Sequence, residues 1–201
     1  IVNALEAQRM AHLYADIDRP LISVLYDMER RGIQVNPAHL AELSKQGLLD
    51  IATLEADIYT MAGKEFNINS PAQVGEVLFT TLGLKGHVRK TGGGALSTAA
   101  AELEKLRDEH PIVERILEYR ELAKLMSTYI EPFPALIGPD GRIHTTYRQV
   151  GTATGRLSSV DPNLQNIPTR TALGQQFRGA FVAQPGFTLL SLDYSQLELR
   201  I

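Results

Sequence analysis

A single carboxylate, Asp193, marks the point at which the end of the chain changes its pattern. The apolar run 188–192 before it has the length of a buried strand, and the residues after it follow helical spacing. A carboxylate at the end of a strand can hold a hard cation such as Mg²⁺, which prefers oxygen ligands and takes others from water and substrate phosphates. Spacing alone favours a simpler interpretation, an aspartate in a turn.

Arginines gather in the stretch 141–192, which includes the apolar run. This stretch holds five arginines, no lysine and one acid, so its local charge is +4 although the net charge of the chain is −3. A charged face that is merely solvated usually mixes both signs and includes lysine, whereas arginine suits planar and phosphate groups. A solvated face and a surface that recognises such groups both remain open.

Two long helices are predicted in the N-terminal two thirds of the chain. Asn36 is a helix cap, Pro37 suits the first turn, and apolar residues then recur at threes and fours as far as Gly63. A helix of about 26 residues is roughly 39 Å long, and its narrow apolar stripe predicts packing against one neighbour. The segment 111–130 has matching apolar spacing, so we expect the two helices to form a hairpin arm.

The tip of this arm contains polar residues at two predicted helix starts. Ser70 and Gln73 have the spacing of a capping box, and a glycine-rich loop leads to a helix begun by Ser97 or Thr98. Free backbone N–H groups at helix starts can bind phosphate, but any loop and helix start needs the same residue types. The two interpretations are evenly balanced. The polar candidates at the tip are Asn67, Asn69, Ser70, Lys90, Ser97 and Thr98.

Other elements flank the arm. Residues 1–31 are predicted to form two helices, the first only loosely amphipathic, and 33–35 alternate like an edge strand. Residues 142–150 alternate like a strand, and 151–170 are predicted to be an ordered loop with little regular structure. The final strand, 187–193, is nearly all apolar, so we expect it in the middle of a sheet, buried on both faces. Phe177, Phe181 and Val182 are predicted to face the core.

Composition sets the outer limits. The 201 residues are 44% hydrophobic, which is enough to bury a core. There is no cysteine, so disulfides and cysteine chemistry are excluded, and no stretch has the length of a membrane span. We therefore expect a soluble, cytoplasmic protein. Both ends look cut, which indicates a fragment, or a chain that a partner completes.

Several strings together resemble one family. DYSQLELR, at 193–200, resembles motif A of the family A DNA polymerases, of the bacterial DNA polymerase I type. INSPAQVGEVLF, KTGGGALST and ILEYRELAKLMSTY are similar to its thumb, and TATGRLSS followed by DPNLQNIP is similar to its primer-template segment. The resemblance implies an α+β, mainly helical fold with a helical thumb hairpin and part of an antiparallel palm sheet. The implied parts are palm-associated helices at 1–33, a thumb at 34–137 and the first part of the palm at 138–201.

The resemblance also implies roles. The reaction would be addition of a dNTP to a primer 3′-hydroxyl with two Mg²⁺ ions, for which Asp193 and the Tyr194 carbonyl are metal ligands. Glu198 would exclude ribonucleotides, although its spacing from Ser195 also fits a capping box. The implied nucleotide-binding residues are Tyr194, Ser195, Gln196, Leu197 and Glu198. The implied DNA-binding residues are Arg156, Gln165, Asn166, Asn163, Arg170, Arg120, Lys124, Lys90, Asn67, Asn69, Ser70, Ser97 and Thr98.

Arg156 illustrates the implied chemistry. Every correct base pair presents a minor-groove acceptor in a nearly equivalent place, so an arginine donor can test pair geometry without reading sequence. Gly155 before it lets the backbone approach a duplex closely. The sequence lacks the fingers and the second catalytic carboxylate, so we expect weak DNA binding and no synthesis by this chain without the remaining polymerase segments. The alternatives are a non-catalytic DNA-binding module and a helical interaction arm with an accidental DYSQ string.

Overall fold

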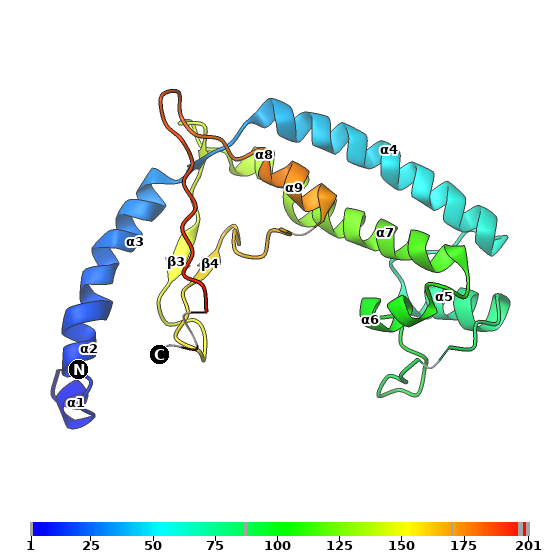
Figure 1. Cartoon of the computed structure of the whole chain (residues 1–201), viewed down its shortest axis with the longest axis horizontal. Coiled ribbons are helices and arrows are strands. Elements are labelled where there is room, and N and C mark those ends of the chain that lie inside the picture. Colours follow the sequence, from blue (N-terminus) through cyan, green and yellow to red (C-terminus); the bar gives the residue numbers. More distant parts are fainter. Residues whose placement is uncertain (1, 87, 170, 197–198, 200–201) are drawn as a thin grey trace. The chain divides into compact units, whose positions relative to one another are not determined.

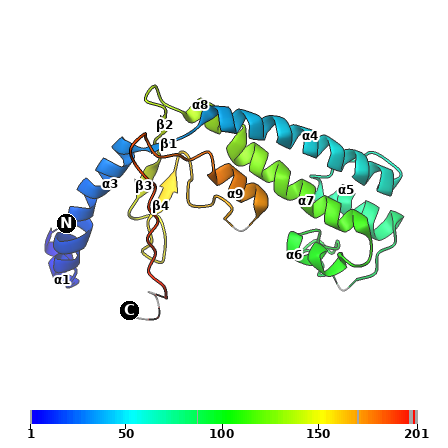
Figure 2. The ribbon, with the colours of Figure 1, turned by 45° about the horizontal axis from the view of Figure 1, so that its top comes forward.

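The computed structural model describes residues 2–86, 88–169, 171–196 and 199, and the chain divides into two compact units (Figures 1 and 2). The first unit comprises Ile1–His39 with Phe133–Ile201, and the second comprises Leu40–Pro132. Helices predominate in the described residues, and the strands are short and antiparallel. The predicted α+β, mainly helical fold class is confirmed.

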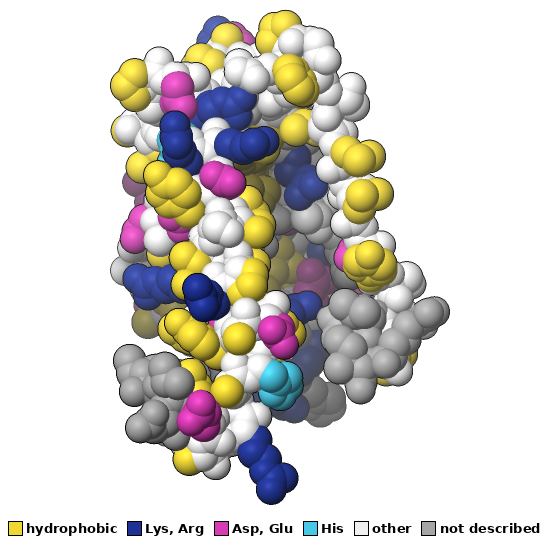
Figure 3. All heavy atoms as spheres, turned by 90° about the vertical axis from the view of Figure 1, so that its left-hand side faces the viewer, with side chains coloured by type: hydrophobic (Ala, Val, Ile, Leu, Met, Phe, Trp, Pro, Cys, Tyr) yellow, Lys and Arg dark blue, Asp and Glu magenta, His cyan; other side chains and the backbone are white. Residues whose placement is uncertain are grey.

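The first unit begins with α1 (Val2–Ala7), α2 (Ala11–Leu13), a π-helical turn (Tyr14–Asp18) and α3 (Arg19–Arg31). α3 ends at Gly32, whose φ of +58° is a left-handed conformation that glycine adopts at little cost. Figure 3 looks onto this side of the chain and shows hydrophobic side chains at the surface among charged ones. α3 itself exposes large hydrophobic side chains, since Ile22, Val24 and Tyr26 are each more than half exposed.

Two small antiparallel sheets follow in the same unit. β1 (Ile33–Gln34) pairs with β2 (Arg142–Ile143), and β3 (Thr146–Arg148) pairs with β4 (Ser158–Val160). β4 lies inside 151–170, which was predicted to be a loop. The strand was not predicted because serines are typical of loops, and this segment is a strand only through its pairing with β3.

Aromatic packing forms the core of the first unit. Phe133 begins α8 (Phe133–Leu136), and Phe177 lies in α9 (Ala172–Arg178). Together with Phe181 they pack edge to face, with ring centroids 5.2 to 6.3 Å apart. The prediction that Phe177 faces the core is confirmed, since it is fully buried.

The predicted final strand is wrong. Residues 187–193 form no strand in the part of the chain that the structure describes, and their side chains are exposed rather than buried. Phe187 is 74%, Leu190 80% and Leu192 85% exposed. A buried strand needs a hydrogen-bonded neighbour on each edge and an apolar layer on each face. Neither is supplied by the described residues, so apolar composition alone does not bury this segment.

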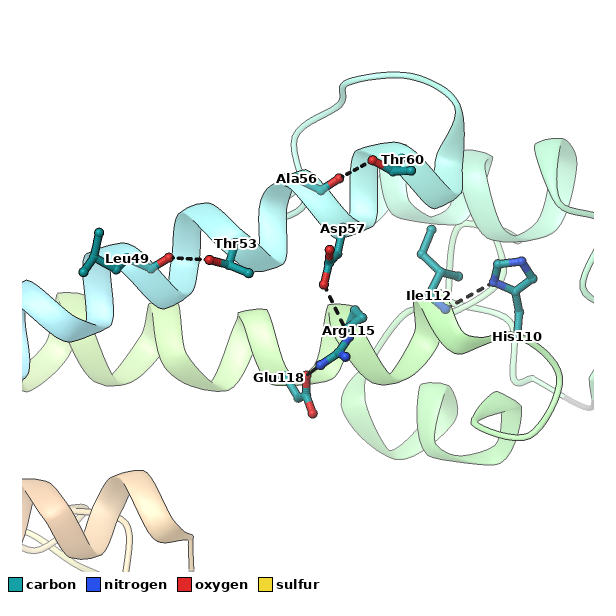
Figure 4. A network of polar contacts seen from close by, with 9 residues as sticks. All are labelled: Leu49, Thr53, Ala56, Asp57, Thr60, His110, Ile112, Arg115 and Glu118. Carbon is teal, nitrogen blue, oxygen red and sulfur yellow. Dashed lines mark hydrogen bonds and ion pairs between the residues drawn. The ribbon is translucent and has the colours of Figure 1, made fainter.

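The second unit is built on a pair of long helices, as predicted. α4 (Pro37–Ala62) begins where Asn36 Oδ1 accepts a hydrogen bond from the His39 N–H (3.2 Å). α7 (Pro111–Leu125) begins where His110 Nδ1 accepts from the Ile112 N–H (3.2 Å), and it continues into a π-helical turn (Met126–Ile130). Figure 4 shows the two helices side by side, with Arg115 of α7 between Asp57 of α4 (3.8 Å) and Glu118 (2.8 Å).

Shorter helices close the core of the second unit. These are α5 (Pro71–Gly75), a π-helical turn (Glu76–Thr81), α6 (Ala100–Leu103) and a 3₁₀ turn (Glu104–Leu106). Fully buried aliphatic side chains from these elements pack against those of α4 and α7; they include Ile58, Val77, Leu78, Leu103, Leu106, Ile112 and Ile116.

The two predicted helix starts at the tip turn out differently. Ser70 caps α5 by accepting from the Gln73 N–H (3.4 Å), although the Gln73 side chain bonds to the Asn67 N–H (2.7 Å) rather than to Ser70. The predicted start of α6 at Ser97 or Thr98 is wrong, because the helix begins at Ala100 and has no side-chain cap. The Ser97 hydroxyl accepts from the N–H two residues later, and Thr98 is buried.

Candidate nucleic-acid interface

Tyr119 of α7 holds one of the predicted binding segments, the loop 67–70. Its hydroxyl donates to Glu55 Oε1 (3.1 Å) and accepts from Asn69 Nδ2 (3.4 Å). Asn67 Oδ1 accepts from the Asn69 N–H (2.9 Å), which tightens the same loop. Burial, and secondarily the Glu55 carboxylate, raises the pKa of Tyr119, so the hydroxyl keeps its proton and remains a donor.

Arg120, the next residue of α7, holds two segments at once. Its Nε donates to the Ile68 carbonyl oxygen (3.3 Å), and Nη1 donates to the Thr98 carbonyl oxygen (2.6 Å). Nη2 is buried with no hydrogen-bond partner among the described residues. Burial lowers the pKa of Arg120, but an arginine remains charged at neutral pH. The two segments, far apart in sequence, are thus fixed on one helix.

Lys124 lies one turn further along α7 and lines a cavity of about 380 Å³. Asn69, Arg120 and Ser127 also line this cavity, and Glu131 supplies one negative charge. Lys124 is exposed and has no ion pair in the part of the chain that the structure describes. Three residues predicted to bind DNA, Asn69, Arg120 and Lys124, therefore lie together in the second unit.

The glycine-rich loop forms a small hairpin, residues 89–97, which we call the basic hairpin. Lys90 pairs with Leu96 in an isolated antiparallel bridge, and the Thr91 N–H donates to the Ala95 carbonyl oxygen (2.7 Å). Gly94, with φ of +84°, makes the turn. The exposed Lys90 ammonium has no ion pair among the described residues, so its charge is available to a ligand.

In the first unit, Arg156 lies in an exposed turn. Gly155 before it has φ of +74°, a conformation that a side chain would strain. The Thr152 hydroxyl donates to the Arg156 carbonyl oxygen (2.8 Å) and closes the turn. The Arg156 side chain is exposed.

The neighbouring amides support their own loop. Gln165 accepts from the Ser159 N–H (3.1 Å) and donates to the Leu157 carbonyl oxygen (3.1 Å). Asn163 Oδ1 accepts from the backbone N–H groups of Gln165 (2.9 Å) and Asn166 (3.2 Å). The side-chain oxygen and nitrogen of Gln165, which was predicted to be an amide donor to DNA, thus both form hydrogen bonds within the loop. Arg170 lies outside the described residues.

The described part of the predicted catalytic segment, residues 193–196, is exposed. Asp193, Tyr194, Ser195 and Gln196 lie in an irregular segment, and Gln196 has φ of +54°. Leu197 and Glu198 lie outside the described residues. Asp193 therefore stands in solvent rather than at the end of a buried strand, which corrects the position expected for it.

The candidate metal ligands are Asp193 and Tyr194. Within the described ranges there is no group of three or more histidine, aspartate and glutamate side chains that could hold a cation. The Asp193 carboxylate and the Tyr194 carbonyl are two oxygen donors at adjacent positions. Mg²⁺ is usually bound through one or two carboxylates, with waters and phosphates as its other ligands. The pair fits part of such a shell.

The sequence did not indicate several residues that hold the candidate DNA-binding segments in place. Glu55 and Tyr119 position Asn69, and Glu102 of α6 accepts from the Arg89 N–H (2.9 Å) at the base of the basic hairpin. The partners in each contact come from different elements, so no local spacing indicates them.

Among the helices that the structure describes, none has the length and apolar composition of a membrane span.

Comparisons with known proteins agree on one family. Residues 37–201 match the profile described as DNA polymerase family A. The thermostable DNA polymerase I of Thermus aquaticus is 53% identical over 195 residues, which are 96% of this chain and 23% of the relative. DNA polymerase I of Deinococcus radiodurans is 49% identical over 190 residues, 94% of this chain and 20% of the relative. The chain thus spans about a quarter or less of these relatives.

A solved structure is similar in fold as well as in sequence. It is the POL domain of Pol1 from M. smegmatis in complex with DNA primer-template and dNTP. The TM-score is 0.85 and the identity 34%, over 93% of this chain and 33% of that one.

Proposed function

Because the chain belongs to DNA polymerase family A, we propose that it supplies the thumb, at 34–137, and the first part of the palm, at 138–201, of a DNA-directed DNA polymerase. The fingers and the second catalytic carboxylate would come from remaining polymerase segments. The proposed partners are primer-template DNA and a dNTP, both of which are bound in the M. smegmatis structure.

One observation carries the proposal of DNA binding. Asn69, Arg120 and Lys124 come from two elements and line one cavity of the second unit, and Arg120 also holds Thr98. Positive side chains and amide donors that converge in this way suit the phosphates of a duplex, whose contacts position a protein without reading sequence. Lys90, Ser70 and Ser97 would extend the same surface.

Asp193 is the proposed metal ligand. Its carboxylate, with the Tyr194 carbonyl, would hold a divalent cation, for which we propose Mg²⁺. Bound cations of this kind activate the attacking hydroxyl and stabilise the leaving pyrophosphate. Ser195, Gln196 and Leu197 would lie along the triphosphate, and Glu198 would pack against the sugar. Arg156 would donate to minor-groove acceptors of the terminal base pair, with Asn163, Gln165, Asn166 and Arg170 beside it.

The test of catalysis is the Asp193→Asn substitution in a polymerase that contains this chain and its remaining segments. We expect primer extension to fall by several orders of magnitude while primer-template affinity changes little, since the lost group binds a cation. Asp27→Asn, which removes an exposed acid of α3 in the same unit, is the matched control and should leave extension intact. Equal extension by the Asp193→Asn enzyme would refute the metal role.

The test of DNA binding uses the chain itself. Fluorescence anisotropy with a labelled primer-template at low salt should detect a complex that added salt dissociates. Failure to bind any duplex would refute the proposed interface. Binding together with full activity of the Asp193→Asn enzyme would favour the alternative, a non-catalytic DNA-binding module.

A further inference from the structure

A buried carboxylate, Glu102, lies at the base of the basic hairpin. Glu102 is only 8% exposed, and its Oε2 accepts two hydrogen bonds. One comes from the Arg89 N–H (2.9 Å), and the other comes from Lys105 Nζ (2.7 Å). The Arg89 carbonyl oxygen in turn accepts from the Ser97 N–H (2.8 Å). Both backbone groups of Arg89, the residue before Lys90, are therefore bonded.

The hairpin needs such an anchor. A two-stranded hairpin is marginally stable by itself in water, and this one has a single bridge and an exposed tip of Thr91 to Ala95. Its C-terminal end is continued by Thr98, which Arg120 holds through the carbonyl oxygen. At its N-terminal end, Arg89 is held by Glu102. Each end of the hairpin thus has one charged side chain that fixes its backbone.

Because Glu102 is negatively charged, holding the hairpin in place and repelling DNA phosphates would have opposite effects on DNA binding. A carboxylate beside a surface that binds phosphates repels the ligand, so its removal should strengthen binding if charge alone matters. The hydrogen bonds from Lys105 and from the Arg89 N–H lower the pKa of Glu102, so it is ionised at neutral pH. If the carboxylate instead holds the hairpin in place, its removal should weaken binding.

We propose that Glu102 is a positioning residue for DNA binding, which acts by fixing the backbone of Arg89 and thereby the location of Lys90. The inference rests on the proposed function, in which Lys90 contacts the DNA backbone. Glu102 itself touches no DNA in this scheme.

The variants separate charge from hydrogen bonding. Glu102→Val removes both the charge and the acceptor, whereas Glu102→Gln removes the charge but keeps one oxygen that can accept from the Arg89 N–H. Glu104→Val and Glu104→Gln are the matched controls, because Glu104 is an exposed acid two residues away that pairs with Arg107 (3.1 Å) and not with the hairpin. Circular dichroism establishes that each variant is folded.

The first measurement is amide hydrogen exchange in the absence of DNA. In Glu102→Val, exchange at Arg89 and Ser97 should accelerate by roughly tenfold or more, since the hairpin opens locally without unfolding the unit. Glu102→Gln should stay near the original rate, and the Glu104 variants should not change it. Unchanged exchange at Arg89 in Glu102→Val would overturn the inference, whatever the DNA result.

The second measurement is primer-template affinity by anisotropy. Glu102→Val should weaken binding by roughly three- to tenfold, the loss expected for one typical hydrogen bond, while the Glu104 variants bind equally or more tightly. In a double-mutant cycle, Lys90→Ala should cost less affinity in the Glu102→Val background than in the original chain, because Lys90 is no longer held in place.

The outcomes are separable. Equal effects of Glu102→Val and Glu104→Val, or additivity with Lys90→Ala, would overturn the positioning role and leave the proposed function standing. Absence of binding by the unsubstituted chain would count against the proposed function, and the exchange result would still decide whether Glu102 holds the hairpin.

Discussion

At the scale of single residues, Lys124 offers the most direct test of a phosphate contact. Lys124→Ala should weaken primer-template binding by about two- to fivefold for every duplex sequence and reduce the slope of log affinity against log salt by about one. Lys64→Ala is the control in the same unit, because Lys64 is engaged with Glu76 (2.7 Å). Anisotropy titrations at several salt concentrations measure both slopes. An unchanged slope for Lys124→Ala would exclude the contact.

We expect His144 to make the stability of the first unit depend on pH. Its Nδ1 lies 2.7 Å from the Glu29 carbonyl oxygen and its Nε2 lies 3.0 Å from Asp140 Oδ2. Both neighbours are acceptors, so both ring nitrogens must donate, which only the imidazolium can do. The hydrogen bond to Glu29, followed by that to Asp140, therefore raises the pKa of His144.

The sign of the pH effect follows from this. The stabilisation is fully present below the ordinary histidine pKa of about 6.5 and is lost as pH rises through the raised pKa of the folded state. Urea unfolding between about pH 5.5 and about pH 8.5 should show the free energy of unfolding falling with pH. His144→Gln should flatten that dependence, and His12→Gln should not, because the exposed His12 side chain forms no hydrogen bond or ion pair with the described residues. A fall of equal size in His144→Gln would contradict the assignment.

At the scale of elements, Gly174 of α9 separates helix propensity from packing. Alanine is the better helix former, so propensity alone predicts that Gly174→Ala stabilises the protein. A Cβ at this position would lie 2.5 Å from the Pro168 carbonyl oxygen, a backbone atom that cannot easily move. We expect a loss of about 1–3 kcal/mol in the free energy of unfolding.

Gly75 of α5 provides the matched control for this substitution. A Cβ there would meet its nearest neighbour, the Thr98 methyl group, at 3.7 Å, an ordinary contact. Gly75→Ala should therefore stabilise the protein by up to about 1 kcal/mol. Thermal or urea unfolding of both variants decides the point, and stabilisation by Gly174→Ala would show that the loop at Pro168 yields.

The elements that could be predicted from the sequence are those with local signals. α4 begins at Asn36 and Pro37 and ends before Gly63 because the cap, the first turn and the left-handed stop are all encoded within the segment. The segments 158–160 and 187–193 could not be predicted correctly, because whether a short segment is a strand depends on its partners. The same distinction applies to the candidate DNA-binding residues. Lys124 could be identified from the sequence, whereas the contacts through which Tyr119 and Glu102 hold neighbouring segments are tertiary and have no local signal.

At the scale of the whole molecule, charge distribution matters more than net charge. The chain has a net charge of −3, yet Lys90, Lys124 and Arg156 are exposed at the predicted contact sites. Local positive charge of this kind supports the proposed DNA binding, which should weaken as salt is added.

The chain without further polymerase segments should bind primer-template weakly and incorporate no dNTP, because the fingers and the second catalytic carboxylate are proposed to come from those segments. A gel-based extension assay with dNTPs and Mg²⁺ measures this, and a polymerase that contains the whole chain is the positive control. Incorporation by the chain alone would show that the proposed need for additional segments is mistaken.

The exposed segment with Phe187, Leu190 and Leu192 has a practical consequence for anyone who handles the chain. Its backbone, which pairs with no strand among the described residues, and its exposed apolar side chains can form intermolecular β-pairing, which is how uncovered edges lead proteins to aggregate. Concentrated preparations are thus expected to precipitate before dilute ones do, and mild detergent should delay the precipitation.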